Sequence, residues 1–62
     1  MNKKATVDLV YDDESKNRRI EVEFNARARD VLGAIDKSVE KAAKDDPDWK
    51  RWNLIEISEE VV

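Results

Sequence analysis

The hydrophobic period of this chain changes from that of a strand to that of a helix near residue 28. Apolar and polar residues alternate over residues 4–11 and again over residues 18–24, as in strands that bury one face. From residue 28 to residue 43, apolar residues instead recur at the three- and four-residue spacing of an amphipathic helix. Because only a short polar joint at residues 12–17 separates the two alternating runs, they are predicted to pair as an antiparallel hairpin.

The segment after the helix predicts a turn and then a third strand. The acidic run at residues 45–48 contains the proline of the chain, and the residue before a proline is biased away from helical dihedrals. Asp46 is predicted to cap a new short helical turn that carries Trp49 and Trp52. The third strand is then expected at about residues 53–58.

These elements predict an α+β fold of order ββαβ in one small domain spanning residues 1–62. A right-handed crossover from the second strand to the third places the helix across one sheet face. The simplest sheet order is 2-1-3, with the first strand antiparallel to both neighbours. The helix is expected at about residues 28–45, and the core from ten apolar side chains: Val7, Leu9, Ile20, Val22, Phe24, Leu32, Ile35, Val39, Ile55 and Ile57.

Four segments carry a resemblance to known domains: residues 19–24, residues 30–35, Asp45-Asp46-Pro47-Asp48-Trp49 and Leu54-Ile55-Glu56-Ile57. Their order is similar to that of a ubiquitin-like β-grasp domain, including the Ras-association branch. The resemblance covers about residues 4–58. Ubiquitin-like domains continue into further strands, whereas the third strand is the last one predicted here. The C-terminal Gly-Gly needed for conjugation is also missing.

The Ras-association resemblance implies a partner site on the second strand. Those domains engage GTPases through this strand and nearby basic residues. By that resemblance, Lys16, Arg18 and Arg19 are the positions at which a protein partner is expected. The alternative interpretation is that these charges keep an edge strand soluble.

Missing residue types argue against catalysis. The chain contains neither Cys nor His, which excludes disulfides, thiol nucleophiles, imidazole bases and metal sites built on those side chains. The acidic run at residues 12–14 lacks the alternation and glycine of a calcium-binding loop, so a turn-forming and solubilising role explains it better. We expect no enzyme activity, no catalytic residue, no metal site and no cofactor.

Neither a membrane nor a nucleic acid is the partner that the sequence favours. No apolar run approaches the ~18 residues of a membrane span, and a cytoplasmic location is the default expectation. The chain has 12 Lys+Arg against 15 Asp+Glu, and its basic residues are interrupted by acidic ones. It therefore lacks the basic footprint of a nucleic-acid-binding protein.

A protein-binding surface is the leading functional hypothesis. If Ile55 and Ile57 face the helix, then Trp52 and Leu54 face outward, where Val10 joins them on the uncovered side of the sheet. Apolar surface patches and exposed tryptophans are typical of contact surfaces. Trp49 belongs to the same candidate surface, unless it folds over the helix end and closes the core, as Trp52 also would in the alternative interpretation.

The chain is therefore predicted to be a small non-catalytic interaction module. It would use the outer sheet face and the third-strand edge, either to form a homodimer or to bind a protein partner. Two alternatives stay open. One is a stand-alone ββαβ fold, natural or designed, with no evolved ligand. The other is a small regulator that acts through charge on nucleic acid or its enzymes.

Overall fold

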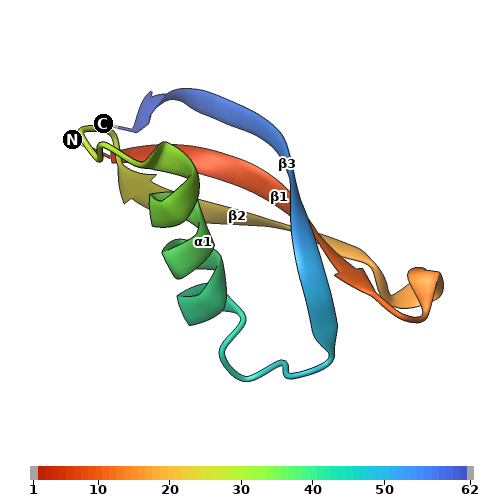
Figure 1. Ribbon diagram of the computed structural model, residues 1–62. Coiled ribbons are helices and arrows are strands. Elements are labelled where there is room, and N and C mark those ends of the chain that lie inside the picture. The colour runs from red at the N-terminus through yellow and green to blue at the C-terminus, as the bar shows by residue number, and fades with distance from the viewer. Residues whose placement is uncertain (1, 62) are drawn as a thin grey trace.

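The predicted ββαβ order and the sheet order are confirmed by the structure, a computed structural model (Figure 1). It describes the backbone of residues 2–61 and the side chains of residues 2–58. The sheet is antiparallel, its order is β2-β1-β3, and the helix lies on one face. The elements are β1 (Asn2–Tyr11), a short 3-10 turn η1 (Glu14–Lys16), β2 (Arg18–Asn25), α1 (Val31–Ala42) and β3 (Trp49–Val61).

Local side-chain hydrogen bonds close the β1–β2 hairpin. The carboxylate of Asp13 accepts a hydrogen bond of 3.0 Å from the backbone N–H of Ser15 and caps η1. Asn17 Oδ1 then accepts a hydrogen bond of 2.8 Å from the backbone N–H of Tyr11. These short polar side chains satisfy backbone donors that the sheet no longer pairs, which is why a polar joint can reverse the chain here.

The helix is shorter than the periodicity predicts, because side chains and turns define its two ends. Asp30 is the N-cap, and its Oδ1 accepts a hydrogen bond of 2.9 Å from the backbone N–H of Gly33. Ala28 belongs instead to a turn, in which its N–H donates to the carbonyl oxygen of Asn25. At the other end, Ala43 is the C-cap. The expected boundaries at residues 28 and 45 thus include the linking turns.

The core lies between α1 and the helix-facing sides of β1 and β2. The helix is closest to β2, where Ser38 Oγ donates a hydrogen bond of 2.7 Å to the carbonyl oxygen of Glu23. Three residues predicted for the core, Leu32, Ile55 and Ile57, are exposed instead. The reason is the position of the helix, which covers β2 rather than β3. The buried side chains are Ala5, Val7, Leu9, Tyr11, Val22, Phe24, Ile35, Val39 and Ala43.

Strand β3 is longer than predicted and irregular. It starts at Trp49, so the expected helical turn carrying both tryptophans is wrong. Its 13 residues run along the 10 residues of β1, and the pairing register shifts at three places. Such extra residues bend a strand and increase its twist, and β3 curves strongly across the sheet (Figure 1).

Candidate protein-interaction surface

An extra residue at Ile55 decides which side chains of β3 face the helix. Leu54 pairs with Val7, whereas Glu56 pairs with Thr6, so the register shifts between these two pairs. Directly paired residues lie on the same sheet face. Because Val7 is buried beneath the helix, Leu54 lies on the helix side.

Trp52 also lies on the helix side, which corrects the prediction that it faces outward. It pairs with the fully buried Leu9 and packs against the core. Its Nε1 donates a hydrogen bond of 2.7 Å to Oδ1 of Asp36 on α1. Val10 pairs with Arg51 on the opposite face, so the predicted outer cluster of Val10, Trp52 and Leu54 is not brought together.

Trp49 packs against the core, as the alternative interpretation expected, rather than lying free on a sheet face. It pairs with Tyr11 at the start of β3 and is half-buried against the core. The ring therefore helps to close the core at the start of β3. It adds little exposed apolar area to either sheet face.

The outer face of the sheet carries charged pairs rather than an apolar patch. Arg19 Nε donates a hydrogen bond of 2.8 Å to Oδ1 of Asp8 on the neighbouring strand. This hydrogen bond lowers the pKa of Asp8 below its ordinary value. Lys4 pairs with Glu23 on the same face. Such cross-strand pairs leave this face well solvated. The prediction of an apolar contact surface on the outer face is therefore not supported.

Most of the exposed apolar side chains lie instead around the helix-facing side of β3. Leu54 and Ile57 share that side, since Ile57 pairs with buried Ala5. On α1, Leu32 precedes Asp36 by four residues, and residues at this spacing share a helix face. The hydrogen bond between Asp36 and Trp52 shows that this helix face borders β3. We call the following group the β3 apolar strip: Leu32, Leu54 and Ile57, which are 59%, 39% and 41% exposed. Ile55 is 44% exposed and is the extra residue at the register shift, so it pairs with no residue of β1.

Strand β3 is also an edge strand. Only one of its sides pairs, with β1. Within residues 49–58, no other element donates a hydrogen bond to the backbone of β3. The opposite edge, β2, differs, because α1 bonds its backbone through Ser38 and Glu23. The edge beside the apolar strip is thus the more accessible of the two.

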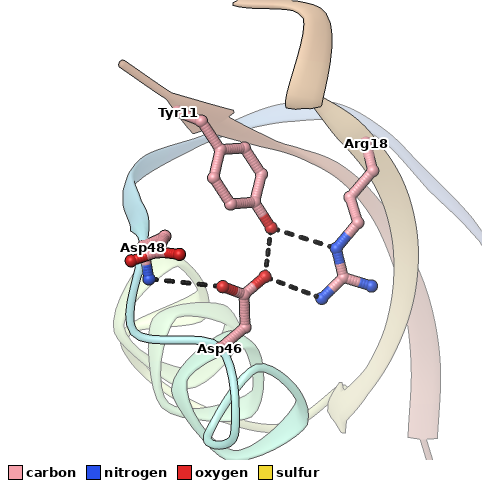
Figure 2. A network of polar contacts seen from close by, with 4 residues as sticks. All are labelled: Tyr11, Arg18, Asp46 and Asp48. Atoms are coloured by element: carbon pink, nitrogen blue, oxygen red, sulfur yellow. Dashed lines mark hydrogen bonds and ion pairs between the residues drawn. The ribbon is translucent and has the colours of Figure 1, made fainter. Parts of the chain in front are cut away.

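A polar network fixes the point at which β3 begins (Figure 2). Tyr11 Oη donates a hydrogen bond to Asp46 Oδ2 and accepts one of 3.1 Å from Arg18 Nε. Arg18 Nη2 lies 3.3 Å from the same carboxylate oxygen. The other carboxylate oxygen accepts from the backbone N–H of Asp48 at 3.2 Å. The network ties the loop after α1 to the hairpin and so positions Trp49.

This network perturbs the carboxyl group of Asp46. The hydrogen bond from Tyr11 is the main cause that lowers the pKa of Asp46 below its ordinary value, with Asp48 N–H and Arg18 adding to it. The ionised carboxylate is the form that accepts these bonds. Asp46 therefore acts as a structural anion here, not as an acid poised to exchange protons.

The Ras-association resemblance predicts a partner site at Lys16, Arg18 and Arg19. Two of these residues, Arg18 and Arg19, already form contacts within the chain. Arg18 belongs to the Tyr11–Asp46 network, and Arg19 is paired with Asp8. Lys16 is exposed at the end of η1. A partner acidic group at β2 would have to compete with carboxylates that already hold both guanidinium groups.

The surface hollows are open to solvent, and each has charged side chains in its lining. One of about 250 Å³ lies near Tyr11, Asp13 and Lys50. Another, of about 380 Å³, lies between β2 and α1 near Glu23 and Lys41. Among the described residues, acidic side chains do not gather in threes as metal ligands would. In the same part of the chain, no helix has the length and apolar character to cross a membrane.

Comparisons with known proteins do not place the chain in a family. No protein-family model matches it, and neither a curated protein nor a solved structure matches it. The fold itself is defined by the structure: a small α+β domain of order ββαβ, with a three-stranded antiparallel sheet and one helix.

Sequence reasoning missed Leu32, Ile55 and Ile57 as surface residues. Their apolar character assigned them to the core, and the alternating pattern gives no sign of an extra residue at Ile55. Leu32 lies on the apolar stripe of the helix, so periodicity alone could not separate it from Ile35. Only the placement of the helix over β2 distinguishes them.

Proposed function

We propose that the chain is a small non-catalytic protein-interaction module that binds its partner through β3. The observation that supports this most strongly is the β3 apolar strip beside an edge strand with unpaired backbone groups. Exposed apolar side chains beside a free strand edge are typical of contact sites on a small domain. The outer sheet face, first expected to share this role, is charged and drops out of the proposal.

Strand addition is the mode of binding that fits this geometry. An extended segment that pairs with a free sheet edge gains backbone hydrogen bonds, and alternate side chains provide specificity. On β3, Leu54 and Ile57 would contact the apolar side chains of such a segment on the helix side. The irregularity at Ile55 bends the strand, so the partner would pair with short stretches on either side of it.

The β-grasp resemblance supports a second position for a partner, on β2. That position would use Lys16, Arg18 and Arg19, as in Ras-association domains. The internal pairing of Arg18 and Arg19 argues for β3 as the main surface. A partner at β2 remains part of the proposal only through the resemblance.

The test is selection of peptide binders against the folded protein. A phage-displayed library of random peptides would be panned on the immobilised chain, and selected peptides would be made synthetically. Affinities would then be measured for the wild type and for the double variant Leu54→Lys/Ile57→Lys. We expect the double variant to lose binding by about tenfold or more, because two charges replace apolar contacts in the site.

Thr6→Lys is the matched control. It adds a lysine to the outer face at a half-buried strand position, and we expect the selected peptides to bind it as they bind the wild type. Circular dichroism would establish that both variants are folded. The proposal would be refuted by peptides that bind the double variant as tightly as the wild type but no longer bind Thr6→Lys. Failure of the library to yield any binder would also refute it.

The stand-alone fold is the second candidate, and the charged outer face favours it. A domain without a ligand has no need of an apolar surface on either side. It predicts that no peptide is selected and that substitutions in the β3 apolar strip change only solubility. The same experiment therefore separates the two candidates.

A further inference from the structure

The loop between α1 and β3 is tied to the sheet by one side chain. Residues 44–48 are exposed apart from Asp46, which is partly buried. Among the residues that the structure describes, every hydrogen bond from this loop to the sheet ends on the Asp46 carboxylate, which accepts from Tyr11 and from Arg18 (Figure 2). The other hydrogen bonds of the loop are local. This carboxylate therefore holds the loop in place.

The first residues of β3 add little to this attachment. Trp49 pairs with Tyr11, whereas the next pair along β3 begins at Arg51. Lys50 is thus an extra residue that interrupts the ladder, and continuous pairing with β1 starts only after it. We call residues 44–50, which comprise the loop and these two residues, the strap.

The strap is loosely packed against the rest of the molecule. It shares a hollow of about 250 Å³ with the hairpin turn, and the lining includes Asp48 and Lys50 from the strap and Asp12 from the turn. Lys50 Nζ lies 3.8 Å from Asp12, but both side chains are largely exposed, and ion pairs of this kind contribute little. Of the strap residues, all of which the structure describes, Trp49 alone packs against the core.

From this arrangement we infer that the Asp46 carboxylate is a latch: when its hydrogen bonds break, residues 44–50 open as a unit while the β1–β2 hairpin and α1 stay folded. Segments with few buried contacts open locally at a lower free energy than the whole fold. Opening would expose the ring of Trp49 and the hydroxyl group of Tyr11 to solvent. The inference goes beyond the proposed binding through β3 and does not depend on it.

Neutralisation of the carboxylate is the change that opens the latch. Three donors face it: the Tyr11 hydroxyl from β1, the Arg18 guanidinium from β2 and the Asp48 N–H from the strap itself. Hydrogen bonds to an ionised acceptor are roughly twice as strong as neutral ones, so protonation of Asp46 weakens all three. The other charged side chains of the strap are exposed: Lys44, Asp45, Asp48 and Lys50.

The latch is therefore sensitive to acid. The pKa of Asp46 is lowered in the folded state, mainly by the hydrogen bond from Tyr11. The carboxylate is thus ionised and the strap closed above the ordinary Asp pKa of about 3.9. The strap is released as the pH falls below that value towards the folded pKa.

The experiment is amide hydrogen exchange of the full chain, resolved by residue with NMR spectroscopy near neutral pH. Asp46→Asn reproduces the neutral side chain, and Tyr11→Phe removes one donor but keeps the ring. Each is expected to lower the protection factors of the strap amides by about tenfold or more, because hydrogen bonds to a charged group are lost. In the wild type, exchange of the strap amides should depend little on added urea, whereas exchange of core amides should depend on it strongly.

Two controls separate opening of the strap from unfolding of the whole chain. Ile35→Val weakens the core that stays folded when the strap opens. Core amides should therefore lose protection by about two- to tenfold, and the strap amides should not change. Asp8→Asn is the matched change of charge, because it removes a carboxylate that pairs with Arg19 on the outer face, and it should leave the protection of the strap amides unchanged.

The inference would be overturned by strap amides that lose protection in Ile35→Val by the same factor as the core amides, because residues 44–50 would then open only with the whole fold. Strap amides that are unprotected in the wild type, or that keep wild-type protection in Asp46→Asn, would also overturn it. Should Asp46→Asn fail to fold, as judged by circular dichroism, Tyr11→Phe decides the same question.

Discussion

The indole Nε1 of Trp52 donates a hydrogen bond of 2.7 Å to Oδ1 of Asp36, and this bond joins β3 to α1. It fixes the ring on the helix side of the sheet and marks the limit of the covered core. Beyond it along β3, Leu54 and Ile57 lie outside the area that the helix covers. The bond thus separates the part of β3 that packs against the core from the exposed part that we propose as the binding site.

Removing either partner of this bond should weaken the fold. Trp52→Phe keeps most of the apolar contact but removes the N–H donor, and we expect a loss of about 1 kcal/mol in the free energy of unfolding. Asp36→Ala should give a similar loss. Both changes remove the same hydrogen bond. The double variant should therefore lose less free energy of unfolding than the two single variants lose together, as measured by urea denaturation. Fully additive losses would show that the hydrogen bond does not contribute.

Side chains on the same helical stripe should differ sharply in their importance. Ile35 is fully buried whereas Leu32 is 59% exposed. Ile35→Ala should therefore cost about 2–5 kcal/mol, and Leu32→Gln should change the free energy of unfolding by less than about 0.5 kcal/mol. Equal losses in urea denaturation would mean that the helix covers β3 after all.

The Tyr11–Asp46–Arg18 network predicts a loss of stability in acid. The pKa of Asp46 is lowered in the folded state. The contribution of its ionised carboxylate to stability is therefore fully present above the ordinary Asp pKa of about 3.9. As the pH falls below that value towards the folded pKa, this contribution is lost. Thermal melts from neutral pH to strong acid would measure it.

Asp46→Asn should lower the melting temperature at neutral pH and flatten its fall in acid. Some pH dependence should remain, because the pKa values of Asp8 and Asp13 are lowered too, by hydrogen bonds from Arg19 and Ser15 respectively. An acid profile identical to that of the wild type would show that Asp46 is not held as an anion by the network.

The first turn of the helix predicts a coupled pair of substitutions. A Cβ added at Gly33 would clash with the carboxyl group of Asp30, which caps the same N–H. Asp30→Ala should cost about 1 kcal/mol. In that background Gly33→Ala should stabilise the helix by about 1 kcal/mol. In the wild type most of that gain should disappear, because the cap is displaced; equal effects in both backgrounds would contradict the predicted coupling.

The topology was predictable because it depends on local patterns. Alternation at residues 4–11 and 18–24 defines two strands, a helical period defines α1, and chain connectivity leaves few ways to assemble them. Val7, Leu9 and Ile35 were correctly placed in the core for the same reason.

The proposed binding surface was not predictable, because two non-local features determine which side chains lie there. One is the extra residue at Ile55, which moves Leu54 to the helix side and depends on pairing with β1. The other is the sideways position of α1 over β2, supported by the Ser38–Glu23 hydrogen bond. Neither feature changes the hydrophobic pattern of the sequence. The pattern therefore predicts the wrong sheet face for Trp52 and a core position for Ile57.

The most direct test of the central claim is residue-by-residue observation of the backbone amides. Proton–nitrogen correlation spectra of the labelled chain would be recorded across the widest concentration range that its solubility allows, and again with a selected peptide. We predict shifts concentrated in β3, with the outer-face residues of β2 unchanged. Shifts centred on β2 or on the outer face, or none in either titration, would contradict binding through β3.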